Sequence, residues 1–273
     1  MSNKNLQTSA DEGAALTYET RTTDVGALDT GVAVLVNNAG EYGWCTTGLS
    51  YTRPGYGDYQ LMAAHCSGFD DDRIVKSPSG ATQYGISRGL EIFWGSSTGN
   101  SDPDGPRLDA ALLDLTTKTT SNKIWVGEWN TDLLGEVNGT STIPYNTSMC
   151  SSGGATGLNC AIERVAPQIL SCVYTTPSGN CGRSARTVEV DSMNGTIMFG
   201  AGDSGGPIYT YSNYDRHINS IVQGGSTSGA VYCGTANHYG SGFICSIDDG
   251  KVTALSSITS ALSGLGFTIR TTN

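Results

Sequence analysis

Hydrophobic and polar residues alternate along this chain in short runs, and clusters of Gly, Asn, Asp and Ser separate the runs. Residues 31–38 (GVAVLVNN), 108–115 (LDAALLDL) and 123–130 (KIWVGEWN) are clear examples. Short runs rich in Val, Ile, Thr and Tyr between turn-forming residues are typical of β-strands. The pattern predicts an all-β protein, built as a sandwich or a barrel.

Two longer segments predict β-hairpins. In the first, residues 43–52 and 58–66 are β-type runs, and residues 53–57 (RPGYG) between them supply a turn. In the second, residues 183–199, the dipeptide Asn194-Gly195 separates two apolar runs and favours a type I′ turn.

One segment near the end has helical periodicity. Its apolar residues recur at spacings of three and four, namely Val252, Leu255, Ile258, Leu262 and Leu265. Asp248 or Asp249 is a suitable cap for the start of this helix, and Gly264 or Gly266 for its end. The run FTIR at residues 267–270 then predicts a closing strand.

The chain of 273 residues is long enough for one large or two modest domains. Residues 1–29 are polar and predict a loosely attached N-terminal extension. The chain turns polar again over residues 131–147, so we expect this stretch to link two halves, residues 30–130 and 131–273.

The charge balance narrows the classes of partner. Lys and Arg number 15 against 25 Asp and Glu, which gives a formal net charge of −10. Phosphate binding needs clustered Lys and Arg, so we expect no nucleic-acid partner. No apolar run reaches the length of a membrane span, so we expect a soluble protein without membrane association.

The eight cysteines are an even number and include no CxxC pair, and three histidines are too few for a convincing zinc site. Four disulfides in a secreted protein explain them better, so we expect no metal and no cofactor. Residues 1–30 contain no apolar signal core, so we expect any secretion signal to have been removed. The acidic stretches 70–72 and 102–104 lack EF-hand spacing, and we interpret them as solvated loops.

Residues 200–210, GAGDSGGPIYT, combine glycines with one serine and match two nucleophile motifs. A G-x-S-x-G elbow requires a helix after the serine, but a proline and a β-type run follow here. A serine-protease loop explains the residues better, because the backbone N–H groups of Gly202 and Ser204 would both face a developing oxyanion. Asp203 would turn inward to an ion pair.

A serine hydroxyl needs a base, and His65 lies upstream in MAAHC. The alternative for His65 is a loop histidine tethered beside a disulfide. The run RLDAALLDL offers Asp109 as the carboxylate that orients the base, with Asp114 as its competitor. The order His65, Asp109, Ser204 has the chymotrypsin arrangement of roles.

These motifs resemble the chymotrypsin-like serine proteases, and within them the bacterial streptogrisin and α-lytic branch. The resemblance spans roughly residues 31–270 and includes MAAHC, LDAALL, GDSGGP, CSSGGATGLNC and IVQGG. It implies two packed six-stranded antiparallel β-barrels with a C-terminal helix, and a catalytic cleft between the barrels. It also implies a monomer that acts on polypeptides.

The resemblance implies disulfides Cys45–Cys66 and Cys150–Cys160. Cys233 then pairs with Cys245, because the usual partner of Cys233 is absent, and Cys172 and Cys181 are left for the fourth bond.

Two positions depart from the branch. Ser151 stands where an arginine usually pairs with the aspartate before the nucleophile, so the partner of Asp203 is open. Gln223 stands where a serine usually supports the buried aspartate, which leaves the surroundings of Asp109 open as well.

The resemblance places the substrate-specificity pocket between two segments and a third wall at residues 241–243. The residues of the two segments are Met198, Phe199, Gly200 and Ala201 on one side and Gln223, Gly224 and Gly225 on the other. The motifs and the cysteines together predict a secreted serine endopeptidase. The apolar side chains and glycines of the pocket predict that it cleaves after Leu, Met, Phe or Tyr. The alternatives are a catalytically silent binding protein on the same fold and an esterase that uses the same serine.

Overall fold

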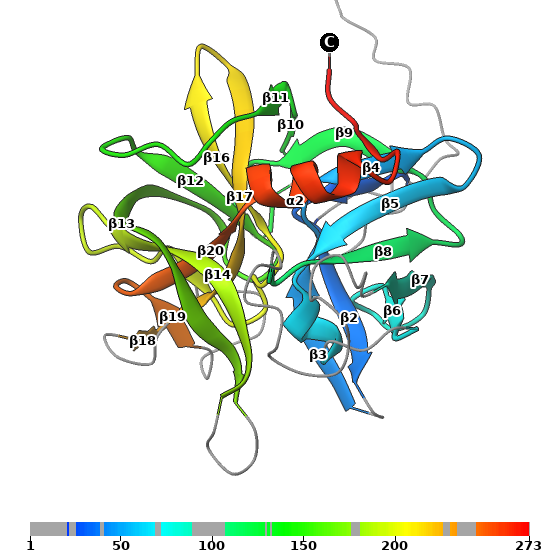
Figure 1. Cartoon of the computed structure of the whole chain (residues 1–273), viewed down its shortest axis with the longest axis horizontal. Helices are drawn as coiled ribbons and strands as arrows, with labels where there is room; N and C mark the ends of the chain where they lie inside the picture. Colours follow the sequence, from blue (N-terminus) through cyan, green and yellow to red (C-terminus); the bar gives the residue numbers. More distant parts are fainter. Residues whose placement is uncertain are drawn as a thin grey trace, which may run out of the picture.

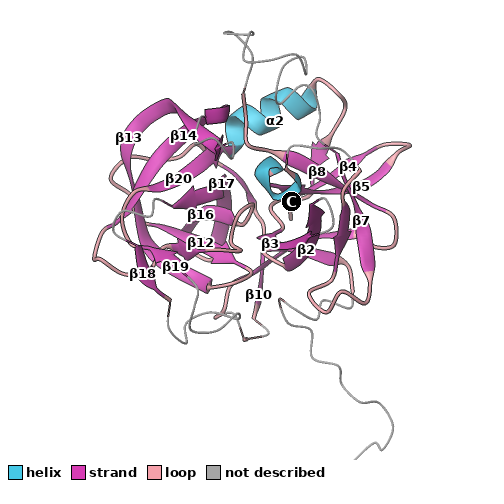
Figure 2. Ribbon diagram, turned by 90° about the horizontal axis from the view of Figure 1, so that it is seen from below, coloured by secondary structure: helices cyan, strands magenta, loops and turns pink. Residues whose placement is uncertain are grey.

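The computed structural model describes residues 21, 26–38, 41–68, 72–88, 107–128, 130–131, 133–175, 181–225, 230–233 and 244–272. Two groups of strands lie side by side (Figure 1). The first is blue and cyan with the green strands β8 (Ala111–Leu115) and β9 (Thr120–Trp125), and the second is green, yellow and orange. Figure 2 shows the same two groups from a perpendicular direction. The all-β prediction is confirmed.

The first half is built on an eight-stranded sheet in the order β21-β4-β5-β8-β7-β6-β2-β3. Its strands are β2 (Ala33–Asn38), β3 (Glu41–Thr46), β4 (Ser50–Arg53), β5 (Gly57–Met62), β6 (Ile74–Lys76), β7 (Gln83–Arg88), β8 (Ala111–Leu115) and β21 (Thr268–Ile269). The hairpin predicted around residues 53–57 is confirmed, because β4 and β5 pair in antiparallel register up to Arg53 and Gly57.

A small sheet extends this half in the order β1-β9-β10, with β1 at Leu28–Thr30, β9 at Thr120–Trp125 and β10 at Leu134–Glu136. Leu28 and Asp29 on β1 are buried, and so is Arg21. The expectation of a loosely attached arm up to residue 29 is therefore wrong at these positions. The apolar side chain of Leu28 packs against Trp125 in the core of the first half, which the polar composition around it concealed.

The second half contains a closed barrel of six strands, because β17 pairs with both β16 and β20. The strands are β12 (Met149–Gly153), β13 (Gly157–Thr175), β14 (Cys181–Ser192), β16 (Pro207–Ser212), β17 (Asp215–Gly225) and β20 (Gly250–Ala254). β11 (Gly139–Thr140) adds to the edge of β17. A separate small sheet has the order β15-β19-β18, formed by β15 (Phe199–Gly200), β19 (Ile244–Ser246) and β18 (Ala230–Tyr232).

The hairpin predicted for residues 183–199 is wrong. β14 pairs with β13 and β20, whereas β15 pairs with β19, so the two runs around Asn194 do not pair with each other. Asn194 and Gly195 do form a turn, and Gly195 has φ of 69°. The chain therefore turns where predicted, but the turn is not type I′, because Asn194 does not have the positive φ that this type needs. The strands on either side of it take other partners.

The predicted C-terminal helix is present as α2 (Leu255–Ser263), but it begins later than expected. Ala254 is its N-cap, and Val252 lies on β20 because it pairs with Val188 and Val222 on neighbouring strands. Gly264 ends the helix as predicted. The buried face of α2 packs into a core cluster shared by both halves, with Leu49 from the first and Ile221 from the second.

Four disulfides link Cys45 to Cys66, Cys150 to Cys160, Cys172 to Cys181 and Cys233 to Cys245. These are the partners that the sequence analysis expects. Within the described residues, no helix is both long and apolar enough to cross a membrane.

Candidate active site

Ser204 lies on the tight loop that joins β15 to β16, at the junction of the two halves. Gly202 and Gly205 adopt φ of 92° and 91°, a left-handed conformation that glycine takes without strain. Thr46 at the end of β3 holds this loop from the other half. Its N–H donates to the Ser204 carbonyl at 2.8 Å, and its hydroxyl donates to the Gly202 carbonyl at 2.7 Å.

Two backbone N–H groups of this loop are left without a partner. The N–H groups of Asp203, Gly205 and Gly206 donate to backbone carbonyls at 2.8 to 3.0 Å. Those of Gly202 and Ser204 make no hydrogen bond to any described residue. These two are the donors that the sequence analysis assigns to an oxyanion hole, and both are available for a ligand oxygen.

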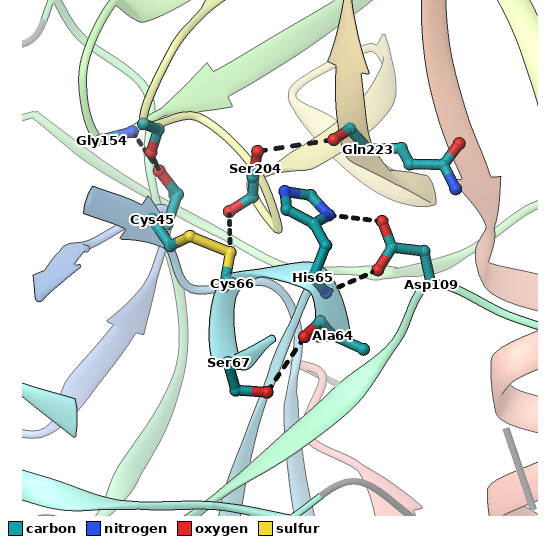
Figure 3. Close-up of a disulfide and its surroundings, with 11 residues drawn as sticks. Cys45, Ala64, His65, Cys66, Ser67, Asp109, Gly154, Ser204 and Gln223 are labelled. Atoms are coloured by element: carbon teal, nitrogen blue, oxygen red, sulfur yellow. Dashed lines mark hydrogen bonds and ion pairs between the residues drawn. A yellow bond between two sulfur atoms is a disulfide. The ribbon is translucent and has the colours of Figure 1, made fainter. Parts of the chain in front are cut away.

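His65 and Asp109 form a direct pair beside this loop (Figure 3). His65 sits on the short 3-10 helix η1 (Ala64–Ser67), and Asp109 comes two residues before β8. His65 Nδ1 lies 2.6 Å from Asp109 Oδ2, and the His65 backbone N–H donates to Asp109 Oδ1 at 2.9 Å. With Asp109 fully buried and His65 partly exposed, the carboxylate orients the ring and leaves its Nε2 edge toward the cleft.

The environment of His65 shifts its basicity. Burial lowers the pKa of His65, but the charge of Asp109 and the hydrogen bond to it raise that pKa, and the net result lies above the usual value of 6.5. A ring nitrogen with this pKa is a stronger base than a free histidine.

Asp114, the competitor for the acidic role, lies elsewhere. It is partly exposed on β8, and its Oδ2 is 3.5 Å from Nε of Arg88. Of the two carboxylates in this run, Asp109 is the one that contacts His65.

Ser204 and His65 lie next to each other without a hydrogen bond between them. The Ser204 hydroxyl donates instead to the backbone carbonyl of Gln223 at 3.4 Å (Figure 3). Hydrogen bonds between catalytic groups are often long or poorly aligned in enzymes without bound substrate.

Asp203 is fully buried and turned away from the cleft. Its carboxylate accepts hydrogen bonds from the backbone N–H of Gly200 and Ala155, both at 2.8 Å, from that of Thr156, and from the Thr156 hydroxyl at 2.6 Å. Burial raises the pKa of Asp203, and these hydrogen bonds act against that rise. The turn between β12 and β13 therefore forms a cradle for the carboxylate.

A buried cation, Arg21, contacts the strand that leads into this cradle, and the sequence analysis missed it. Its guanidinium is fully buried and donates to the Ser152 hydroxyl at 2.7 Å and to the carbonyl of Gly153 at 3.2 Å. Burial lowers the pKa of Arg21 to about 10, and the negative charge of Asp203 counteracts this. Asp203 thus has a buried counter-charge across the Gly153 peptide rather than a direct ion pair. No local motif around Arg21 signals this.

Gln223 does not support Asp109. Its side chain is buried, and neither Oε1 nor Nε2 has a hydrogen-bond partner. The carboxylate of Asp109 is held within the described residues by His65 alone.

The residues assigned to substrate binding fall into two groups. Gln223, Gly224 and Gly225 line a cavity together with His65. Met198 and Phe199 are buried in the core of the second barrel, and Gly225 faces Ser246, with the edge of the Phe199 ring farther away. Gly200 packs against the Cys233–Cys245 disulfide, and Ala201 is exposed. The third wall at residues 241–243 lies outside the described residues, as do Asp70, Asp71 and residues 102–104.

Among the described residues, no group of three or more His, Cys, Asp or Glu side chains is arranged to hold a metal ion.

The chain has the chymotrypsin-like double-barrel fold of bacterial serine proteases. No family model and no curated protein sequence matches it. Among solved structures it is similar to Nocardiopsis protease, with 19% identity, TM-score 0.57 and coverage of 89% of this chain and 100% of that one. It is similar to a glutamic acid-specific serine protease described as using a histidine triad in substrate binding (18%, TM-score 0.57, 89% and 100%). A third is Thermobifida fusca protease A (17%, TM-score 0.56, 90% and 100%). At such low identity these matches describe the fold.

Proposed function

We propose that this protein is a secreted serine endopeptidase with Ser204 as nucleophile. The observation that carries the proposal is the His65–Asp109 pair beside a serine loop whose Gly202 and Ser204 N–H groups have no partner among the described residues. A base, an oriented carboxylate and two oxyanion donors meet at one serine, as acyl transfer requires. The four disulfides support an oxidising, extracellular location.

The reaction proceeds through an acyl-enzyme. Ser204 Oγ attacks the peptide carbonyl carbon while His65 Nε2 takes the hydroxyl proton, and the N–H groups of Gly202 and Ser204 stabilise the oxyanion. The C–N bond then breaks as His65 returns the proton to the leaving amine. Water, deprotonated by His65, attacks the acyl carbon and releases the acid and Ser204. Asp109 stabilises the imidazolium throughout.

We propose cleavage after medium or large apolar residues. The strand residue Gly225 faces Ser246, an uncharged side chain, and the Phe199 ring lies farther away in the same direction. Met198 and Phe199 are both buried in an apolar cluster. A charged side chain would lose its hydration next to this cluster, whereas a Leu-sized one would gain about 1.5–3 kcal/mol from burial.

One observation favours the rival, a catalytically silent binding protein: the Ser204 hydroxyl bonds to Gln223 and not to His65. The other alternative, an esterase with a nucleophile elbow, needs a helix directly after the serine loop. The strand β16 follows Gly206 instead, which argues against the esterase.

Active-site labelling tests the proposal. A fluorophosphonate should form one stoichiometric adduct on Ser204, located by peptide mass spectrometry, and His65→Ala should abolish it. His217→Gln and Ser256→Ala are matched controls away from the site and should label normally. A peptide series varied before the scissile bond should be hydrolysed fastest with Leu, Met, Phe or Tyr. Absence of both labelling and hydrolysis in the folded protein would favour the silent protein.

A further inference from the structure

A cavity of about 230 Å³ lies beside His65, one of the proposed catalytic residues. His65 borders it together with Gln223, Gly224 and Gly225 of β17, Cys172 and Val173 of β13, and Lys251 of β20. Both titratable side chains in this lining are bases, although acidic residues outnumber basic ones over the whole chain. Of these two bases His65 is paired with Asp109, so Lys251 is the cation of the lining that is available to a ligand.

Lys251 projects on the cavity face of the sheet. It lies directly opposite Gly224 in the pairing of β17 with β20, and opposite residues of neighbouring strands share a face. A side chain at Gly224 would meet no atom, so the space above this glycine is open to the lysine and to a ligand. The Lys251 ammonium has no ion pair or hydrogen bond with any described residue.

A second polar group in the same wall lacks a partner. Both atoms of the Gln223 side-chain amide are buried and make no hydrogen bond. A buried amide without a partner is destabilising unless a ligand or water satisfies it. Both amide atoms are closed off from solvent, so the Lys251 ammonium is the donor in this lining that suits a carboxylate.

The strand beside the cavity is suited to bind an extended peptide. β16 pairs with β17 only up to Ile221. Gly224 and Gly225 pair on one side with β20, and the Gln223 carbonyl on the other edge accepts from Ser204. A peptide added to this edge alternates its side chains between two faces. Gly225 faces Ser246 on β19, with the Phe199 ring farther away, and Gly224 faces the cavity.

We propose that this cavity is a subsite for an acidic side chain of the substrate, bound by Lys251. The proposal rests on the proposed endopeptidase function. If the residue that contributes the scissile carbonyl points toward Phe199, alternation directs the second and fourth residues before the scissile bond to the cavity face. The substrate class is thus a peptide with an apolar residue at the cleaved bond and a Glu or Asp two or four positions from it.

Glu189 limits the strength of this subsite. It pairs with Lys251 on the other side of β20 and is partly exposed on the same face. Its negative charge opposes an incoming carboxylate, so Glu189→Gln should increase the preference for acidic peptides.

The test compares matched peptides that carry Glu or Gln at the second or fourth position before the scissile bond. Binding is measured on Ser204→Ala by fluorescence anisotropy, and kcat/KM on the wild type. We expect the Glu peptide to bind about three- to fivefold more tightly at low salt, the upper range for a partly exposed ion pair, and less so as salt increases. Lys251→Met in the Ser204→Ala background should bring the ratio to one, and Lys251→Glu should favour a Lys peptide.

Lys123→Met is the matched control, because Lys123 is exposed on β9 and does not line the cavity. It should retain the Glu preference. Equal affinity of Ser204→Ala for both peptides, or a preference that survives in Lys251→Met, would overturn the subsite. If the subsite is overturned in this way but the wild type hydrolyses the Gln peptide, the endopeptidase function is still supported. A preference for Glu in binding without any hydrolysis by the wild type would refute the endopeptidase and leave the subsite supported.

Discussion

At the level of single residues, His65 is held so that only one of its ring nitrogens faces the cleft. The contact of Nδ1 with Asp109 selects the neutral form that carries its proton on Nδ1. The nitrogen left over, Nε2, is the acceptor that a serine hydroxyl needs. A base of this kind works only when it is unprotonated.

The raised pKa of His65 therefore predicts the pH profile. Because the imidazolium is favoured by Asp109, kcat/KM should rise with pH through an apparent pKa above 6.5, and not below it. Asp109→Asn should lower that apparent pKa and reduce kcat by about 10³–10⁴-fold without unfolding the protein. The measurement is kcat/KM from pH 4 to 10, with circular dichroism on each variant.

Asp114→Asn serves as the control, since Asp114 contacts Arg88 and not His65. Its pH profile should match that of the wild type. A large loss of activity in Asp114→Asn with a normal Asp109→Asn would contradict the assignment.

At the level of elements, the two disulfides near the cleft have different tasks. Cys45–Cys66 joins β3 to η1, the 3-10 helix that carries His65, and both cysteines are buried. Cys172–Cys181 lies near the end of the β13–β14 hairpin, whose strands also pair farther in, as at Ser171 and Ala185. The first disulfide constrains the core, and the second shapes one wall of the cavity.

We predict that removing these two bonds separates stability from substrate binding. Cys45→Ser with Cys66→Ser should lower the free energy of unfolding by about 3 kcal/mol in the chain-entropy model. Cys172→Ser with Cys181→Ser should cost less, because the hairpin end can loosen locally, and should raise KM more than it lowers kcat. Denaturant unfolding and steady-state kinetics on both double variants check this. A larger stability loss at the hairpin than at the core bond would contradict it.

At the level of the whole molecule, Arg21 connects segments that are far apart in sequence. Its guanidinium donates to the carbonyls of Gly31, Gly127 and Gly153, and its bond to the Ser152 hydroxyl spans 131 positions of the chain. The Ser152 hydroxyl in turn bonds to the Trp125 carbonyl. A single side chain thus connects Gly31 and Gly127 with Gly153, which lies in the cradle of Asp203.

Arg21→Met should consequently affect both stability and catalysis. It removes the donors for four acceptors and the counter-charge of a buried carboxylate, so we expect about 3 kcal/mol less free energy of unfolding and a lower kcat. Arg21→Lys should recover only part of both, because one ammonium cannot reach all four oxygens. Arg186→Met, on the exposed side of β14, is the control and should behave as the wild type. An Arg21→Met variant as stable as the wild type would contradict this role.

Much of the fold could be predicted because it depends on local chemistry. Glycines allow the tight turn at residues 53–57, and Gly202 and Gly205 permit the serine loop. Gly264 ends α2 as expected, whereas the start of the helix was predicted too early. Val252 continues the apolar spacing of the helix, but pairing with two neighbouring strands holds it on β20. The apolar spacing alone does not show whether Val252 belongs to the helix or to the strand before it.

The sequence by itself determined the all-β class, the serine loop and which histidine and aspartate were candidates. Each depends on residues within a few positions of one another, where backbone conformation follows from residue type. Only the tertiary structure decided that Asp109 and not Asp114 meets His65, that Arg21 lies near Asp203, and that Lys251 shares a cavity with His65. Those contacts join distant segments, because burial brings together charges that no local pattern relates.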